Sequence, residues 1–186
     1  KPGLMHDQVT WWRRPLDAEK MHEAAQALMG LNDFTSFRAS DCQANHPKRT
    51  MLDISVKRQG EWVVLEVCAN AFLYHMVRNI AGVLLPIGQG SKPVAWCREV
   101  LQAQDRKQAG VTAPGGGLYF VDVDYPNYPD LPIDPDGPSF YSFMSKLNII
   151  FYFLINFFDR FFYFFFRYDY FAFILIKFFC NFFNTF

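Results

Sequence analysis

One charged side chain, Arg78, lies in a strongly apolar stretch, and its surroundings point to chemistry. Arg78 sits among four apolar residues of this stretch: Phe72, Met76, Val77 and Ile80. An arginine on such a face costs several kcal/mol to desolvate unless a carboxylate or phosphate meets it. Because the same stretch holds no acid, we expect the partner to come from elsewhere in the fold or from a ligand. The alternative is an arginine that reaches out to water or pairs with a structural acid.

Hydrophobic periodicity predicts the elements that position Arg78. Apolar residues at helical spacing predict three helices, at about 17–29 with Asp17 as N-cap, 72–87 and 93–104. Alternating or apolar runs predict three strands, at about 52–57, 62–69 and 118–125. Helices and strands are mixed and do not alternate strictly, so we expect an α+β fold: a mixed, largely antiparallel sheet with packed helices.

Three loops connect these elements. Phe34 and Phe37 lie in a loop over residues 33–38, and we expect both to anchor it in the core, although base stacking is the alternative. Residues 40–48 have no clear period and include His46-Pro47, which favours an exposed loop. Residues 113–117 form a glycine-rich loop that lacks the lysine of a phosphate-binding loop.

Composition limits the classes of function. Residues 1–139 carry 14 Lys and Arg against 16 Asp and Glu, a net charge of −2, which gives no electrostatic argument for nucleic acid. The four cysteines form no C-x-x-C pair, and the four histidines show no metal-binding spacing. We therefore expect a reduced, cytoplasmic setting with no metal.

Three segments, read together, carry a family resemblance. They are Asn32-Asp-Phe-Thr-Ser-Phe-Arg-Ala39, Asn70-Ala-Phe-Leu-Tyr-His-Met-Val-Arg-Asn-Ile-Ala-Gly82 and Gly117-Leu-Tyr-Phe-Val-Asp-Val-Asp-Tyr-Pro126. In this order and spacing they resemble the C-terminal half of the TruA family of tRNA pseudouridine synthases. The resemblance covers about Val9 to Pro138, and it implies a pseudouridine-synthase-like half domain.

The resemblance also implies a reaction and a set of site residues. The family isomerises uridine to pseudouridine in the anticodon stem-loop of tRNA, without a cofactor and as a homodimer. By resemblance, Arg78 is the active-site arginine and Leu118 lines the uracil pocket. The loop over residues 40–45 is similar to the one that contacts tRNA, and the RNA-binding candidates are Arg38, Asp41, Cys42, Gln43, Ala44 and Asn45.

Each assignment has a structural alternative. Leu118 could be a plain strand residue in the core, and residues 40–45 could be an ordinary polar loop. Arg38 ends the first motif and could instead support the site. Tyr74 and His75 precede Arg78 by one turn or less, so they could touch the site, although aromatic helix residues usually pack.

The two ends of the sequence depart from the family pattern. The family's nucleophilic aspartate lies in an Arg-Thr-Asp-Ala-Gly stretch, and no such stretch occurs in these 186 residues. We therefore expect residues 1–139 to be the C-terminal portion of a synthase, a fragment that is inactive alone. Residues 140–186 hold 18 of the 22 phenylalanines and no glycine, proline or valine. Of these 47 residues, 37 are types encoded by codons of A and T alone, so we expect an out-of-frame or disordered segment.

Two other functions remain open. A non-catalytic remnant could bind RNA without making product, although the net charge of −2 counts against it. A membrane-tethered protein could use residues 140–186, but Asp159-Arg160, Arg167, Asp169 and Lys177 interrupt the apolar runs below the ~18 residues that a spanning helix needs. We therefore regard membrane association as the weaker alternative.

Overall fold

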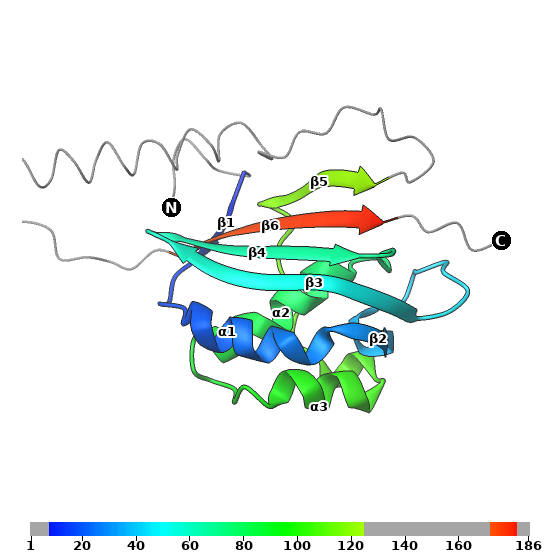
Figure 1. Ribbon diagram of the computed structural model, residues 1–186. Coiled ribbons are helices and arrows are strands. Elements are labelled where there is room, and N and C mark those ends of the chain that lie inside the picture. Colours follow the sequence, from blue (N-terminus) through cyan, green and yellow to red (C-terminus); the bar gives the residue numbers. More distant parts are fainter. Residues whose placement is uncertain (1–7, 125–171, 182–186) are drawn as a thin grey trace, which may run out of the picture.

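A six-stranded mixed sheet forms the centre of the protein. The computed structural model describes residues 8–124 and 172–181. The strands are β1 (Thr10–Trp12), β2 (Gly30–Asp33), β3 (Lys48–Gln59), β4 (Trp62–Ala69), β5 (Leu118–Asp124) and β6 (Ala172–Asn181). Their order is β1-β6-β4-β3-β2, and β5 also pairs with β6 (Figure 1).

Antiparallel and parallel pairings occur on the two sides of β4. The pairs β2/β3, β3/β4 and β1/β6 are antiparallel, whereas β4/β6 and β5/β6 are parallel. β1 pairs with residues 172–174 of β6, and β5 pairs with residues 176–181 of it. These two strands therefore follow each other along the same side of β6. The predicted α+β class with a mixed, largely antiparallel sheet is confirmed.

The helices all lie on one side of the sheet (Figure 1). They are α1 (Ala18–Ala25), α2 (Met76–Gly88) and α3 (Trp96–Ala103), with 3₁₀ turns η1 (Gln26–Leu28), η2 (Thr35–Phe37) and η3 (Arg106–Gln108). On this side, α3 packs against α1 and α2. Asp17 caps α1 by accepting a hydrogen bond from the Lys20 amide, as predicted. The core between the layers contains Met21 of α1, Ile54 of β3, Leu65 of β4 and Ile80 of α2. Burial of this apolar surface is the main force that holds α2 against the sheet.

Other sequence predictions are confirmed or corrected in detail. Phe34 and Phe37 are fully buried, with ring centroids 5.9 Å apart, and so anchor their loop as expected. The helix expected from Phe72 begins at Met76, because His75 has a φ of 59° that an α-helix does not accommodate. The short strand β2 lies in a stretch for which no strand was predicted.

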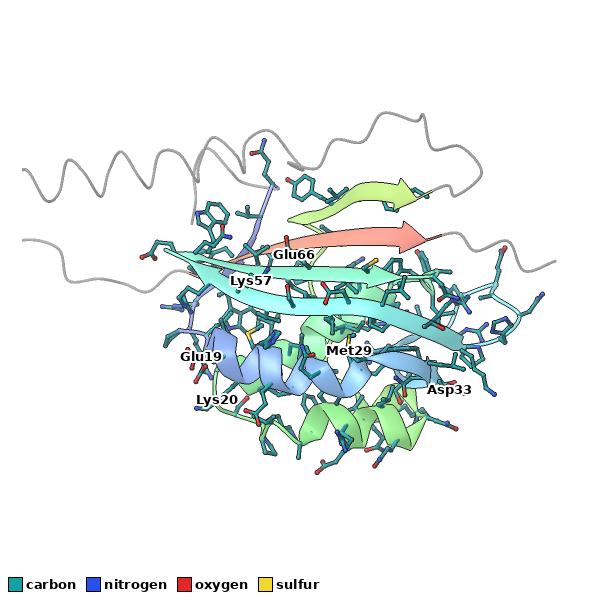
Figure 2. All side chains as sticks on the ribbon, viewed as in Figure 1. Glu19, Lys20, Met29, Asp33, Lys57 and Glu66 are labelled. Carbon is teal, nitrogen blue, oxygen red and sulfur yellow. The ribbon has the colours of Figure 1, made fainter. Side chains whose placement is uncertain are left out.

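The sheet face away from the helices carries polar side chains. Ile54 and Val56 belong to the core, so the alternating residues Ser55 and Lys57 of β3 point to the opposite face. The Lys57 ammonium lies 3.3 Å from the carboxylate of Glu66 on β4 (Figure 2). A half-exposed pair of this kind contributes little stability, about 1 kcal/mol or less.

The C-terminal segment 140–186 lies mostly outside the described residues. Only residues 172–181 are described, and they form β6 between β4 and β5. The expectation that this segment is out of frame or disordered, and the domain boundary at residue 139, stay predictions. In the described ranges, no helix has the length and apolar character needed to cross a membrane.

Candidate active site

Arg78 is held at the first turn of α2 by two neutral groups. Its Nε donates to the carbonyl of Ala113 at 2.8 Å, and its Nη1 donates to Nε2 of His75 at 3.2 Å. The side chain is half-buried, and it forms no ion pair with a carboxylate in the described part of the chain. Its positive charge is therefore not compensated there, and its Nη2 donors remain for a further partner.

The hydrogen bond between Arg78 and His75 defines the state of the imidazole. A guanidinium has only donors, so Nε2 of His75 must be the acceptor. This hydrogen bond uses the tautomer that carries its proton on Nδ1. Two acceptors thus orient the guanidinium without neutralising it, so its charge stays available to an anionic group.

A segment after α3 contains Ala113, whose carbonyl accepts the hydrogen bond from Arg78. Asn79, fully buried next to Arg78, donates to the Phe37 carbonyl at 2.7 Å. Its Oδ1 accepts from Nη2 of Arg106 at 3.0 Å and from the hydroxyl of Thr112 at 2.7 Å. We call residues 106–113 the strap. The network fastens the strap across α2 next to Arg78.

Two glycines allow the strap to cross α2 at close range. A Cβ on Gly82 of α2 would lie 1.9 Å from the carbonyl oxygen of Val111. A Cβ on Gly110 of the strap would lie 2.3 Å from the carbonyl oxygen of Gly82. Only glycine fits at these positions, so backbone contact places Ala113 over Arg78. The Ala113 amide also donates to the Arg78 carbonyl at 3.1 Å.

Leu118 follows the glycine-rich loop that runs from the strap past Arg78 to β5. Gly115 lies beside Arg78, since a Cβ there would be 3.9 Å from the Arg78 Cζ. The Gly115 carbonyl accepts from the Leu118 amide at 3.3 Å, and the Gly116 carbonyl accepts from the Thr10 hydroxyl. Leu118 begins β5 and is half-buried against the core. One loop therefore joins the two residues predicted to be catalytic.

The predicted RNA-binding loop divides into exposed and anchoring residues. Asp41, Gln43 and Asn45 are exposed, whereas Cys42 and Ala44 are half-buried and pack against the core. The exposed three could reach a ligand in solvent, and the other two hold the loop in place.

The side chain of Arg38, which precedes this loop in the sequence, hydrogen-bonds to its backbone. Its Nη2 donates to the carbonyls of Cys42 at 2.6 Å and Ala44 at 2.8 Å. These bonds shape the loop, so the placement favours the supporting role that was the alternative for Arg38.

Cys42 connects the loop to the segment before α2. Its Sγ accepts from the Tyr74 amide at 3.4 Å, and the Ala39 amide donates to the Tyr74 carbonyl at 3.1 Å. Desolvation raises the pKa of Cys42, but hydrogen bonds from the Tyr74 and Ala44 backbone and from Arg38 outweigh it, so the pKa lies below its usual value.

The sequence reasoning missed Asn79, Arg106 and Thr112. A signal for Asn79 existed, because a polar residue within the apolar run of α2 must find hydrogen-bond partners when buried. No periodicity links it to Arg106, 27 residues further along. An open depression of about 300 Å³ contains none of the predicted site residues; it is lined by Ala27, Asn32, Asp33, Arg98, Leu101, Gln102 and Gln104. Among residues 8–124 and 172–181, no cluster of His, Cys, Asp or Glu could hold a metal ion.

Comparison with known proteins agrees with the resemblance of the three motifs. The family model described as "tRNA pseudouridine synthase" matches residues 24–126. The chain is 55% identical over 130 residues to tRNA pseudouridine synthase A of Hydrogenovibrio crunogenus, covering 70% of this chain and 50% of the relative. It is 51% identical over 140 residues to that of Klebsiella pneumoniae subsp. pneumoniae, covering 75% and 52%.

A third relative gives the same picture. The chain is 51% identical over 142 residues to tRNA pseudouridine synthase A of Pseudomonas aeruginosa, covering 76% of this chain and 50% of the relative. The chain thus spans about half the length of the curated relatives that it matches. The family match covers more than half of the chain, so the protein belongs to the tRNA pseudouridine synthase family.

Proposed function

We propose that this chain is part of an enzyme that converts uridine to pseudouridine in the anticodon stem-loop of tRNA. Family membership supports the reaction. The observation that carries the proposal is the guanidinium of Arg78, half-buried, held by two neutral acceptors and without an acid partner in the described residues. Such a group can pair with an anion, and the catalytic carboxylate that this reaction uses is one.

The chemistry gives Arg78 and Leu118 defined tasks. The reaction breaks the C1′–N1 glycosidic bond, turns the base and joins C1′ to C5, while the C5 proton leaves and N1 gains one. A carboxylate nucleophile suits this sequence because it can add covalently and later leave. Arg78 pairs with that carboxylate and fixes its orientation and charge. Leu118 packs against the uracil ring once the base has left its stack.

The nucleophile comes from a part of the enzyme outside these 186 residues. The family's Arg-Thr-Asp-Ala-Gly stretch does not occur in them, and the curated relatives are about twice as long as the matched region. On this proposal the intact enzyme is a cytoplasmic homodimer that needs no cofactor. The chain alone makes no product.

The predicted contact loop over residues 40–45, together with Arg38 and Ala39 before it (residues 38–45), binds the tRNA beside this site. Exposed Asp41, Gln43 and Asn45 offer amide and carboxylate groups that can hydrogen-bond to ribose hydroxyls and base edges. Arg38 donates from Nη2 to the carbonyls of Cys42 and Ala44, so its part in RNA binding is to shape this loop.

Activity of a joined protein tests the role of Arg78. The 186-residue chain is linked to the part of the Pseudomonas aeruginosa relative that lies outside the match. This chimaera is incubated with tRNA carrying tritium at C5 of uridine, and release of tritium reports formation of the new C–C bond. We expect release by the chimaera and none by the chain alone. Arg78→Ala should reduce the rate about a hundredfold or more, because it removes a preorganised charge at the reacting carboxylate.

Matched variants separate this role from folding. Arg98→Ala removes an exposed arginine of α3 and should leave the rate within about twofold. Arg78→Lys keeps the charge but loses the planar fork, so its rate should fall between those of wild type and Arg78→Ala. Equal rates for Arg78→Ala and Arg98→Ala would remove Arg78 from the site.

A second function is tRNA binding without catalysis, by a remnant that kept its fold. It predicts tRNA binding that weakens as salt increases, and no tritium release by the chimaera. The same experiment therefore distinguishes the two functions.

A further inference from the structure

Tyr74 and His75 form a stacked aromatic pair at the edge of the site. Their ring centroids are 4.0 Å apart and the rings are inclined by only 22°. Tyr74 is 51% exposed, although large aromatic side chains usually bury most of their surface. The outer ring of this pair is therefore open to solvent, while the inner ring rests on the protein.

The backbone of His75 is held in an unusual conformation. Its φ of 59° and ψ of 10° lie in the left-handed region, and its side chain makes no capping hydrogen bond to α2. Such a conformation in a non-glycine residue costs about 1 kcal/mol or more and persists where the surroundings require it. In this backbone conformation, the His75 imidazole stacks on Tyr74 and accepts a hydrogen bond from Arg78.

Tyr74 also connects the two candidate functional regions. Its amide donates to Sγ of Cys42, and its carbonyl accepts from the Ala39 amide, so its backbone is tied to the loop over residues 38–45. Its ring is tied through His75 to Arg78. An exposed aromatic face therefore lies between the arginine of the active site and the loop expected to contact tRNA.

We propose that the exposed face of Tyr74 stacks on an unpaired nucleobase of the RNA, next to the uridine that enters the site at Arg78. This inference rests on the proposed function. Bases in single-stranded loops are recognised by stacking on aromatic side chains, and every base has a π-face that can do so. The stack on His75 pre-orients the Tyr74 ring, so little conformational freedom is lost when a base binds.

The proposal assigns distinct tasks to the three side chains. Tyr74 contacts the base, His75 supports the ring from behind, and Arg78 acts on the reacting centre. Loss of the Tyr74 ring should therefore weaken RNA binding and raise KM, with a much smaller effect on kcat.

A binding experiment with single abasic positions tests the contact. The Kd of the full 186-residue chain and of the chimaera is measured for an anticodon stem-loop RNA, and then for RNAs in which one loop nucleotide at a time is abasic. Tyr74→Ala should raise the Kd about tenfold, whereas Tyr74→Phe, which keeps the ring, should stay within about twofold. In the RNA that lacks the base stacked on Tyr74, at one position beside the target uridine, Tyr74→Ala should cause no further loss of affinity.

The proposal would be overturned if the loss of affinity caused by Tyr74→Ala added to the loss caused by base removal at every abasic position. It would also be overturned by an equal loss for Tyr74→Phe and Tyr74→Ala, because the hydroxyl and not the ring would then matter. Tyr74→Leu keeps an apolar side chain and provides a second variant if Tyr74→Ala lowers the melting temperature. Leu31→Ala on β2 removes another exposed apolar side chain and serves as the control, with an unchanged Kd.

The two proposals fail in different ways. The proposed function would be refuted, and the stacking contact kept, by one abasic position at which Tyr74→Ala causes no further loss of affinity, together with no tritium release. Normal tritium release together with additive losses would refute the stacking contact alone. If neither the chain nor the chimaera binds the stem-loop, the stacking contact is refuted.

Discussion

At the scale of single residues, the site depends on a charge that the protein holds without neutralising it. The partners of Arg78 are a backbone carbonyl and a neutral imidazole, which orient a guanidinium but leave its charge intact. An acid in the same position would have satisfied Arg78 and removed its attraction for an incoming carboxylate. The need for a partner could be deduced from the sequence, because an arginine in an apolar run requires one. The identity of the acceptors could not, because Ala113 lies 35 residues away.

The hydrogen bonds around Cys42 give a prediction about reactivity. A pKa below the usual value means that, at a pH between the two values, a larger fraction of Cys42 is thiolate than of an ordinary thiol. Burial raises the pKa of Cys97 to about 12, so that thiol stays protonated. We expect iodoacetamide to modify Cys42 at least tenfold faster than Cys97 at pH 8, as measured by mass spectrometry of the peptides.

A variant checks the cause. Arg38→Ala removes one of the groups that lower the pKa of Cys42, so it should slow the modification at pH 8. Faster modification of Cys97 than of Cys42 would contradict the loop structure described here.

At the scale of elements, the site is made where the strap crosses α2. The strap carries Ala113, the glycine-rich loop after it carries Leu118, and α2 carries Arg78. Asn79 joins these parts to η2 through the Phe37 carbonyl. A change in the crossing therefore acts on both predicted catalytic residues at once.

Substitution of Gly82 tests the crossing. In an exposed helix, Gly→Ala stabilises by up to about 1 kcal/mol. Here the new Cβ would meet the Val111 carbonyl at 1.9 Å, and overpacking of this kind costs about 3 kcal/mol. We therefore expect Gly82→Ala to lower the free energy of unfolding by about 2 kcal/mol, as measured by urea denaturation.

Gly115 offers the matched control for this prediction. A Cβ there meets only the Arg78 side chain, at 3.9 Å, which is ordinary contact. Gly115→Ala should leave the free energy of unfolding within about 0.5 kcal/mol. Unchanged stability in Gly82→Ala would show that the strap does not lie against α2.

Helices and strands were predicted accurately where the local hydrophobic pattern is clear. The strand over residues 62–69 was predicted with the bounds that β4 has, because its apolar run ends at clear turn residues. The start of α2 was predicted four residues too early, since Phe72 fits the helical spacing and only the backbone of His75 interrupts it. The four-residue strand β2 exists through its pairing with β3, which no local pattern contains.

At the scale of the whole molecule, β6 joins parts of the sheet that are distant in sequence. It lies between β4 on one side and β1 and β5 on the other, so it connects the strand that carries Leu118 to the rest of the sheet. No element was predicted over residues 172–181, because the composition of residues 140–186 indicated an out-of-frame or disordered segment.

Hydrogen exchange tests the place of β6. In the full chain, the β4 amides that point toward β6 should be as protected as those that point toward β3. A chain that ends at residue 139 leaves one side of β4 unpaired, so only the β6-facing amides should exchange faster. Equal protection in the full and shortened chains would show that residues 172–181 do not pair with β4.

The most direct test of the proposed function is position-resolved mapping of pseudouridine in tRNA. A tRNA transcript is incubated with the chimaera or with its Arg78→Ala variant, and every modified position is read at nucleotide resolution. We expect pseudouridine in the anticodon stem-loop with the chimaera, and at most about one hundredth of that rate with Arg78→Ala. Modification elsewhere in the tRNA, or equal modification by the variant, would contradict the assignment of this site.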